Sequence, residues 1–431
     1  MKYLNGNKKN SLNNLEKFLN ARRLKQQNQS KIVKKLLLDV KKYGDKSVLK
    51  FEKKFSKLKT NTKKIKFSKD EINQISKKVD KKLKKSIDIA FKRIKYFHTK
   101  QKFSSFRYKD KFKNELSYKY SPIERVGVYV PGGTASYPST VLMNCIPALV
   151  AGVKNIFLTT PALGLSVNPA IIYAAKKCGV KEIYKTGGAH SIAAFTYGTK
   201  TFKKVDKIVG PGNAFVAAAK KEVFGQVGID MVAGPSEVSI IADKNSNANW
   251  IASDLIAQAE HDVLAQSILI SNNRNLIKSV KLCLKSQLKD LPKKNIASKS
   301  IKNYGLAIYA NSTKKISEIV NLIAPEHLEI SFSKSKDLIK KIKNAGSIFI
   351  GKFSPEAMGD YIAGPNHVLP TSGSAKFSSG LSVNDFLKRH SLIKITKTGI
   401  ERLGPSVINL SQHENLEGHA RSVKIRLKKD L

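Results

Sequence analysis

The sequence has few cysteines, few acidic residues and no long apolar segment. Its three cysteines, scattered along 431 residues, exclude a disulfide framework and a cysteine-rich zinc module, and they suit a reducing cytoplasm. No apolar run approaches the roughly 20 residues that a membrane-spanning helix needs. The first residues also lack an apolar stretch followed by a small-residue cleavage site. We therefore expect a cytoplasmic location, no secretory signal and no membrane association.

The shortage of acidic residues leaves a formal net charge of +47, from 79 lysines and arginines against 32 aspartates and glutamates. Such an excess is compatible with nucleic-acid binding, because these side chains neutralise phosphates. A dedicated nucleic-acid surface tends to use arginine forks and interleaved aromatic rings. Here the excess is mostly lysine, concentrated in residues 31–114 and 275–345. We interpret it as a compositional bias on a solvated surface and expect no specific nucleic-acid partner.

The order of apolar and turn segments predicts an α/β fold. Residues 31–104 have apolar stripes at helical spacing, and from Val126 onward short β-rich runs alternate with helices and glycine turns. Such alternation is typical of parallel, helix-covered sheets, here two α/β units with interleaved chain segments and a separate C-terminal appendage. The expected strands cover residues 126–130, 155–160, 182–186, 205–210, 237–242, 266–271, 305–310, 328–332 and 347–351.

Five glycine turns lie at the ends of predicted strands. They are PGGT (131–134), TGGAH (186–190), GPGN (210–213), AGPSE (233–237) and AGPN (363–366). In open parallel sheets, ligands bind outside the carboxyl ends of the strands, so we expect these turns to line one crevice. A full GxGxxG fingerprint is missing, because Phe215 stands where the third glycine would be. The turns alone therefore indicate dinucleotide binding only weakly, and about half of them are explained equally well as tight turns that need positive φ.

Several potential metal ligands occur in segments that contain little lysine. Gln258 and His261 are three residues apart and share one face of a predicted helix. Asp360 and His367 flank a glycine turn. The tail segment HENLEGHA adds His413, Glu414, Glu417 and His419. A single histidine at a helix end is often only a surface or capping residue, but this set favours a metal site with zinc as the first candidate.

The segment APEHLEI places Glu326 next to His327, just before a predicted strand. A histidine can transfer protons near neutral pH, and a neighbouring carboxylate can activate water. The alternative is a turn that the Glu-His pair caps. Cys145 lies in an apolar helical pattern with no base adjacent in sequence, so we interpret it as a buried structural thiol rather than a nucleophile.

Together these segments resemble one family, histidinol dehydrogenase, the last enzyme of histidine biosynthesis. The resemblance runs from about Lys31 to the C-terminus. It is carried by VGVYVPGGTASYPSTVLMNCIPA, GPGNAFVAAAK, DMVAGPSEV, DLIAQAEHD, APEHLEI, GDYIAGPNHVLPT and LEGHA. It implies a homodimer with a shared active site, each subunit having two incomplete Rossmann-like domains and small N- and C-terminal pieces. We place an N-terminal helical extension at 1–30, a first α/β domain at 31–125 with 237–320, a second at 126–236 with 321–380, and a C-terminal dimerisation arm at 381–431.

The resemblance also assigns roles to individual residues. It implies one Zn²⁺ per subunit, bound by Gln258, His261, Asp360 and His419, the last from the partner subunit. Positions implied to surround the substrate are Ser236, Gln258, His261, His327, Asp360, His367, Glu414 and His419. Positions implied to contact NAD⁺ are Tyr129, His190 and Asn213. His190 departs from the family pattern, in which GGAQ is common.

The implied reaction is the oxidation of L-histidinol to L-histidine through L-histidinal, with two NAD⁺. His327 and Glu326 are the implied catalytic residues: His327 accepts the alcohol proton and Glu326 activates water. Two alternatives remain. One is a related NAD-linked zinc dehydrogenase of another amino alcohol or a hydroxy-sulfonate, and the other is a nucleic-acid-binding protein.

Overall fold

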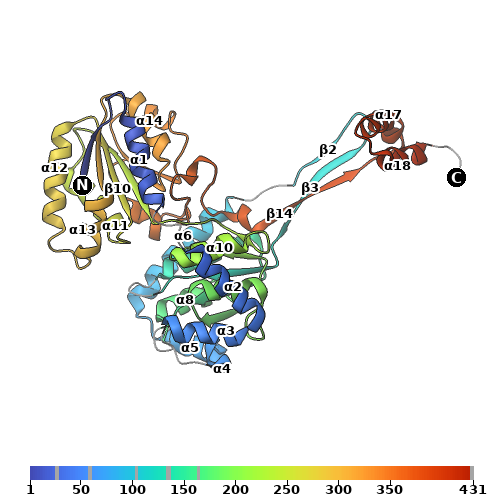
Figure 1. Ribbon diagram of the computed structural model, residues 1–431, viewed down its shortest axis with the longest axis horizontal. Helices are drawn as coiled ribbons and strands as arrows, with labels where there is room; N and C mark the ends of the chain where they lie inside the picture. The colour runs from blue at the N-terminus through green and yellow to red at the C-terminus, as the bar shows by residue number, and fades with distance from the viewer. Residues whose placement is uncertain (25–28, 57–60, 102–104, 133–136, 163–165, 428–431) are drawn as a thin grey trace.

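The structure is a computed structural model that describes residues 1–24, 29–56, 61–101, 105–132, 137–162 and 166–427. The chain forms two α/β lobes and an arm that extends away from both of them (Figure 1). No helix among these residues is long and apolar enough to cross a membrane.

The first lobe contains a parallel six-stranded sheet in the order β1-β11-β10-β9-β12-β13. The strands are β1 (Lys2–Asn5), β9 (Glu237–Ala242), β10 (Gln266–Ser271), β11 (Leu306–Tyr309), β12 (His327–Ser331) and β13 (Ser347–Ile350). The helices are α1 (Ser11–Leu24), α11 (Ala248–Ala259), α12 (Arg274–Gln287), α13 (Lys294–Tyr304), α14 (Thr313–Ile323), α15 (Ser335–Ile339) and α16 (Glu356–Tyr361). Successive side chains of β9 point to opposite faces, so Ile241 packs with α1 and α14 while Ile240 packs with α11 and α12.

The second lobe contains a parallel five-stranded sheet in the order β6-β5-β4-β7-β8. The strands are β4 (Arg125–Tyr129), β5 (Asn155–Thr160), β6 (Glu182–Lys185), β7 (Lys207–Val209) and β8 (Gly228–Ile229). The helices are α2 (Ser30–Tyr43), α3 (Asp45–Phe51), the π-helix η1 (Glu52–Ser56), α4 (Thr62–Ile65), α5 (Lys69–Lys77), α6 (Lys81–Thr99), α7 (Pro138–Ala151), α8 (Pro169–Lys177), α9 (Gly188–Tyr197) and α10 (Ala214–Val223).

Both sheets have a Rossmann-like strand order. Numbered along the chain within each lobe, the strands of the second lobe run 3-2-1-4-5, and those of the first lobe do the same once β1 is set aside as an added edge strand. The predicted fold class, α/β with two incomplete Rossmann-like domains, is therefore confirmed. The strands expected at 155–160, 237–242 and 266–271 have the predicted bounds.

The two lobes divide the chain differently from the predicted boundaries. The helices of residues 30–99 pack on the second lobe, where Val33 of α2 shares a core with Tyr129 and Ile192. β12 and β13 belong instead to the first lobe, because β12 pairs with β9. The predicted grouping of 31–125 with 237–320, and of 126–236 with 321–380, is therefore corrected. An apolar helical stripe reveals that a helix is covered, but not which of two sheets covers it.

The arm is an antiparallel sheet, β14-β3-β2, with two helices at its tip (Figure 1). Its elements are β2 (Arg107–Lys109), β3 (Glu115–Pro122), β14 (Leu387–Lys394), α17 (Lys397–His413) and α18 (Glu417–Leu427). Two short 3₁₀ turns, η2 (Ser374–Lys376) and η3 (Val383–Phe386), precede β14. The separate C-terminal piece predicted at 381–431 forms this arm together with residues 107–122, which the sequence prediction placed in a globular domain.

Candidate active site

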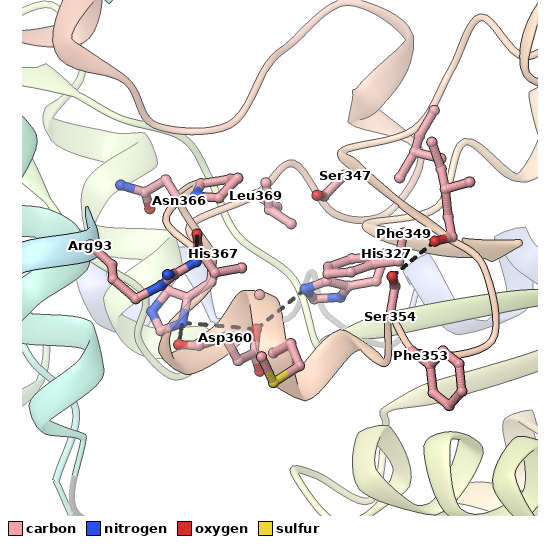
Figure 2. Close-up of a pocket in the computed structure, with 16 residues that line it drawn as sticks. Arg93, His327, Ser347, Phe349, Phe353, Ser354, Asp360, Asn366, His367 and Leu369 are labelled. Carbon is pink, nitrogen blue, oxygen red and sulfur yellow. Dashed lines mark hydrogen bonds and ion pairs between the residues drawn. The ribbon is translucent and has the colours of Figure 1, made fainter. Parts of the chain in front are cut away.

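A pocket of about 310 Å³ lies along the edge strand β13 of the first lobe and reaches the amino end of β12. His327 and Ser347, the first residues of β12 and β13, line it, together with Asp360 of α16 and His367 from the following loop. Arg93 reaches the pocket from α6 of the second lobe, where its Nε donates to the carbonyl of Ile362 at 2.7 Å (Figure 2). The pocket therefore lies where the two lobes meet.

Asp360 lies between two histidines in this pocket (Figure 2). Its Oδ1 is 3.6 Å from Nε2 of His327 and 3.9 Å from Nδ1 of His367, and its backbone carbonyl is 2.9 Å from the latter atom. Burial raises the pKa of Asp360. The nearby His327, His367 and His261 lower it by a larger amount, so the pKa lies below its usual value. Asp360 is thus held as a carboxylate, the form that binds a cation.

Three side chains are close enough to share one metal ion. Ligand atoms of His261, Glu356 and Asp360 all lie within 4.8 Å of one another. A histidine nitrogen and carboxylate oxygens suit zinc, and at this spacing one ion can contact all of them. His261 lies two residues beyond the end of α11, after the cap residue Glu260, and Glu356 precedes Asp360 by about one turn of α16.

Gln258 lies next to this cluster and is buried. Its amide is assigned so that the nitrogen donates to the two carboxylate oxygens of Glu356, at 2.9 and 3.0 Å, and to the carbonyl of Glu237 at 3.3 Å. The amide oxygen is then the atom that remains for a metal. The structure therefore brings together three of the four predicted zinc ligands, Gln258, His261 and Asp360, within one subunit.

Glu326 and His327 are both buried and both bonded to the backbone of Glu237. The amide of Glu237 donates to Oε2 of Glu326 at 2.8 Å, and its carbonyl lies 3.0 Å from Nδ1 of His327. With Nδ1 bonded in this way, Nε2 of His327 is left without a hydrogen-bond partner among the described residues and lines the pocket. Burial raises the pKa of Glu326 to about 7.

The protonation state of His327 depends on the nearby carboxylates. Burial lowers the pKa of His327, but Glu356, Glu326 and Asp360 outweigh it and raise the pKa well above its usual value. A divalent cation bound by Glu356 and Asp360 would cancel much of this negative charge. Metal binding would therefore favour the neutral imidazole, which is the form that accepts a proton.

The chain is similar to known proteins along almost its whole length. A family model described as histidinol dehydrogenase matches residues 19–427. The histidinol dehydrogenase of Pelagibacter ubique is 55% identical over 430 residues, which cover 100% of both chains. That of Acinetobacter baylyi is 45% identical and covers 92% of both. The chain belongs to the histidinol dehydrogenase family.

The tertiary structure agrees with this assignment. The crystal structure of histidinol dehydrogenase from Elizabethkingia anophelis superposes with a TM-score of 0.89 at 40% identity, and the match covers 93% of this chain and 92% of that one. The similarities support histidinol dehydrogenase function, an oxidoreductase activity in histidine biosynthesis, over the predicted alternative of a nucleic-acid-binding protein.

Five of the eight residues that the family resemblance places around the substrate do not line the pocket: Ser236, Gln258, His261, Glu414 and His419. Gln258 and His261 lie next to the pocket residue Asp360 in the metal cluster, and Ser236 directly precedes β9. Glu414 ends α17 and His419 lies in α18, and both side chains are exposed at the tip of the arm, far from the lobes that form the pocket (Figure 1). Within one subunit the arm does not bring them to Asp360.

The family's predicted NAD⁺ contacts lie in the second lobe. Tyr129 ends β4 and is buried, with its hydroxyl accepting from the amide of Gly188 at 3.1 Å. Asn213 caps the N-terminus of α10 through its side-chain oxygen. Thr186 and Gly210 follow β6 and β7 directly, so the TGGAH and GPGN turns lie at carboxyl ends of this sheet.

The expectation that all five glycine turns follow strand carboxyl ends is only partly correct. AGPSE connects the second lobe to the amino end of β9, and AGPN follows α16. Residues 133–134 of PGGT lie outside the described residues. The error has a simple cause: turn residues mark where the chain reverses, but not which edge of a sheet it has reached.

His190, which departs from the family pattern, is 2% exposed. Its Nε2 lies 2.7 Å from Oε1 of Glu52, and the same carboxyl accepts from the amide of Gly187 at 2.9 Å and from the hydroxyl of Thr186. Glu52 therefore joins His190 to Thr186 and Gly187, the first two residues of the same TGGAH turn.

Sequence reasoning missed Glu356, Glu237 and Glu52. Glu356 carries a usable signal, because it stands four residues before Asp360, the spacing that places two side chains on one face of a helix. Glu237 and Glu52 carry none, since their partners are 89 and 138 residues away along the chain. Cys145 is a buried thiol, as predicted. A hydrogen bond with Cys178 and burial raise its pKa, which disfavours the nucleophilic thiolate.

Proposed function

We propose that the chain oxidises L-histidinol to L-histidine through L-histidinal, with two NAD⁺ and one Zn²⁺ per subunit. The observation that carries the proposal is a pocket lined by His327 and Asp360. Beside it lie Glu326, next to His327, and the side chains of His261 and Glu356, whose ligand atoms are within 4.8 Å of that of Asp360. A pocket of about 310 Å³ lies within the range that small polar ligands occupy.

The donor set fits zinc. His261 supplies a nitrogen, Asp360 an ionised carboxylate and Gln258 an amide oxygen, and Glu356 adds a second carboxylate that also orients the Gln258 amide. When bound, the ion holds the substrate's imidazole and amine as a template rather than generating hydroxide.

The protein's own residues handle the protons. In the first oxidation, Nε2 of His327 accepts the alcohol proton while the carbinol carbon gives up a hydride; the bond of Nδ1 to the carbonyl of Glu237 fixes the ring. The two hydrides of the reaction go to two NAD⁺. In the second oxidation, Glu326 removes a proton from the water that attacks the aldehyde, and His327 accepts the proton of the resulting diol.

The dinucleotide is proposed to lie against the turns after β4, β6 and β7. Helices α9 and α10 begin directly after the turns that follow β6 and β7, and a helix N-terminus at this edge of a Rossmann-like sheet can bind a phosphate. Tyr129 and Asn213 hold these turns, and His190 is the third proposed contact. Because His190 is bonded to Glu52, we expect it to influence NAD⁺ binding by fixing the conformation of the TGGAH turn.

The active enzyme is proposed to be a homodimer in the cytoplasm. The arm projects from the lobes (Figure 1). It also exposes apolar side chains, which favours a surface that a second copy covers. These residues are Phe106, Tyr108, Leu392, Ile393, Ile395, Leu403, Val407, Leu410, Leu416 and Ile425. A second subunit would also bring Glu414 and His419 to the pocket. Free Cys145, Cys178 and Cys283 are consistent with a reducing compartment.

NADH formation tests the proposal. Zinc-loaded protein should form two NADH for each L-histidinol consumed, with L-histidine as the product. Other amino alcohols and hydroxy-sulfonates serve as alternative substrates in parallel. If the metal-loaded dimer forms no NADH from L-histidinol but does so from one of these, the substrate assignment is wrong.

A further inference from the structure

Arg22, near the end of α1, is 2% exposed and bound inside the protein. Its Nε donates to the carbonyl of Leu264 at 2.7 Å, and its Nη2 donates to the carbonyls of Pro235 at 2.6 Å and Ser236 at 3.3 Å. Its Nη1 donates to Oε1 of Glu237 in a buried ion pair. A planar guanidinium can satisfy several acceptors at once, which a lysine ammonium on a flexible stem does less well.

The segment that Arg22 holds is the one to which the catalytic pair is bonded. The backbone of Glu237 donates to Glu326 at 2.8 Å and lies 3.0 Å from Nδ1 of His327 through its carbonyl. The same carbonyl accepts from the amide of Gln258 at 3.3 Å. The backbone of Glu237 is therefore bonded to three site residues. They are the proposed proton acceptor His327, the proposed water-activating Glu326 and Gln258 of the metal site.

The side-chain carboxyl of Glu237 is bonded as well as its backbone. Its Oε1 accepts from the amide of Ser372 at 3.1 Å as well as from Arg22. Without the guanidinium, this buried carboxylate would lose its charged partner, and the carbonyls of Pro235 and Ser236 would lose donors. Because leaving a buried charge without its partner is costly, the segment would be expected to shift.

We propose that Arg22 is a positioning residue for catalysis: it fixes residues 235–237 and thereby sets the positions of Glu326 and His327. The inference rests on the proposed function. It assigns a catalytic purpose to the N-terminal helix, which lies at the start of the family match and carries none of the predicted site residues.

The alternative is that Arg22 only anchors α1 to the lobe. Such an anchor would lower the stability of the protein when removed, but the turnover of the molecules that remain folded would not change. Leu19 provides the matched control, since it is a buried core residue of the same helix and belongs to the apolar cluster of α1. Arg23 provides a second control, because its side chain donates to Asn20 within the same helix at 3.4 Å.

The test compares Arg22→Gln and Arg22→Lys with Leu19→Ala and Arg23→Gln in zinc-loaded dimers. We expect Arg22→Gln to lower kcat by about ten- to a hundred-fold, the usual effect of losing a supporting partner of an active-site group. The KM for NAD⁺ should stay within about two-fold, because the dinucleotide turns are on the other lobe. Arg22→Lys should recover part of kcat, and Leu19→Ala should lower the unfolding midpoint while leaving kcat unchanged.

Hydrogen exchange of the peptide that contains residues 233–238 gives a second readout that does not depend on turnover. Arg22→Gln should speed exchange of the Glu237 amide, whereas Arg23→Gln should not. A kcat for folded Arg22→Gln within two-fold of wild type, or unchanged exchange, overturns the proposal. If the wild-type protein fails to oxidise L-histidinol, the proposed function fails instead, and the exchange experiment still decides whether Arg22 holds the segment.

Discussion

Nε2 of His327 and Oδ1 of Asp360 lie 3.6 Å apart, between the start of a strand and a short helix that are separated by 33 residues in sequence. The proposed proton acceptor and a proposed metal ligand are therefore immediate neighbours. In this arrangement, the occupancy of the metal site and the charge of His327 depend on each other.

Replacing His327 with Gln should abolish most of the turnover. The amide cannot accept a proton at neutral pH, so kcat should fall by about a hundred- to ten-thousand-fold, the range for removal of a general base. The measurement is steady-state NADH formation, with zinc content determined on the same samples. His390→Gln is the matched control, because His390 is exposed on the arm. Turnover of His327→Gln within a few-fold of wild type would exclude the assigned role.

Removal of a first-lobe ligand should release the metal. His261→Asn and Asp360→Asn should lose zinc during dialysis against a mild chelator, because each removes a donor from a group whose ligand atoms lie within 4.8 Å. Zinc per subunit after dialysis is the measurement, and His390→Asn is the control. Full zinc retention by His261→Asn would show that the ion, if any, binds elsewhere.

Glu356→Gln separates two roles for that residue. If Glu356 chiefly orients Gln258, a glutamine there weakens zinc binding by about ten- to a hundred-fold without abolishing it. A direct ligand would give a loss as large as that of Asp360→Asn. Competition with a chromogenic chelator measures the difference, and unchanged zinc affinity would contradict both roles.

Two inactive variants should restore activity when mixed, if the arm completes the partner's site. His261→Asn affects the lobe of a subunit and His419→Asn affects its arm. In a mixed dimer, one site then carries both changes and the other carries neither. After unfolding and refolding together at equal amounts, about one quarter of wild-type activity is expected, since half of the dimers are mixed and each has one intact site of two. No recovery, with mixed dimers demonstrated, would place His419 outside the partner's site.

The second oxidation should depend on pH through Glu326. Burial raises its pKa to about 7, so the protonated form prevails below that pH and the carboxylate above it. Only the carboxylate can activate water, and the rate with L-histidinal should therefore rise as pH increases through about 7. Glu326→Gln should be slow at every pH and lack this rise. A wild-type rate that is flat between pH 6 and 8 would count against this role.

Much of the fold followed from local patterns. The strands at 155–160, 237–242 and 266–271 each contain consecutive apolar residues rather than a strict alternation, which is typical of a parallel strand covered on both faces. The antiparallel β3 (Glu115–Pro122) is not among the expected strands, although Leu116, Tyr118 and Tyr120 alternate with polar residues as in a half-exposed strand. The edge strand β1, only four residues long, was missed as well.

Most of the candidate site was also present in the sequence, though in pieces. The spacing of Gln258 and His261, and the adjacency of Glu326 and His327, are local facts of the sequence, although α11 ends at Ala259 and His261 lies in the turn after it rather than on the predicted helix face. The supporting bonds, Arg22 to Glu237 and Glu52 to His190, join residues 215 and 138 positions apart. No local pattern predicts such partners.

The sequence by itself determined the element types, the α/β class and the family's characteristic segments, because these depend on side-chain periodicity and on short motifs. Only the tertiary structure decided which sheet each helix covers, that Glu356 joins His261 and Asp360, and that His419 stands on an arm away from its own pocket. Those outcomes depend on how distant surfaces pack against each other, and packing is a property of the folded chain as a whole.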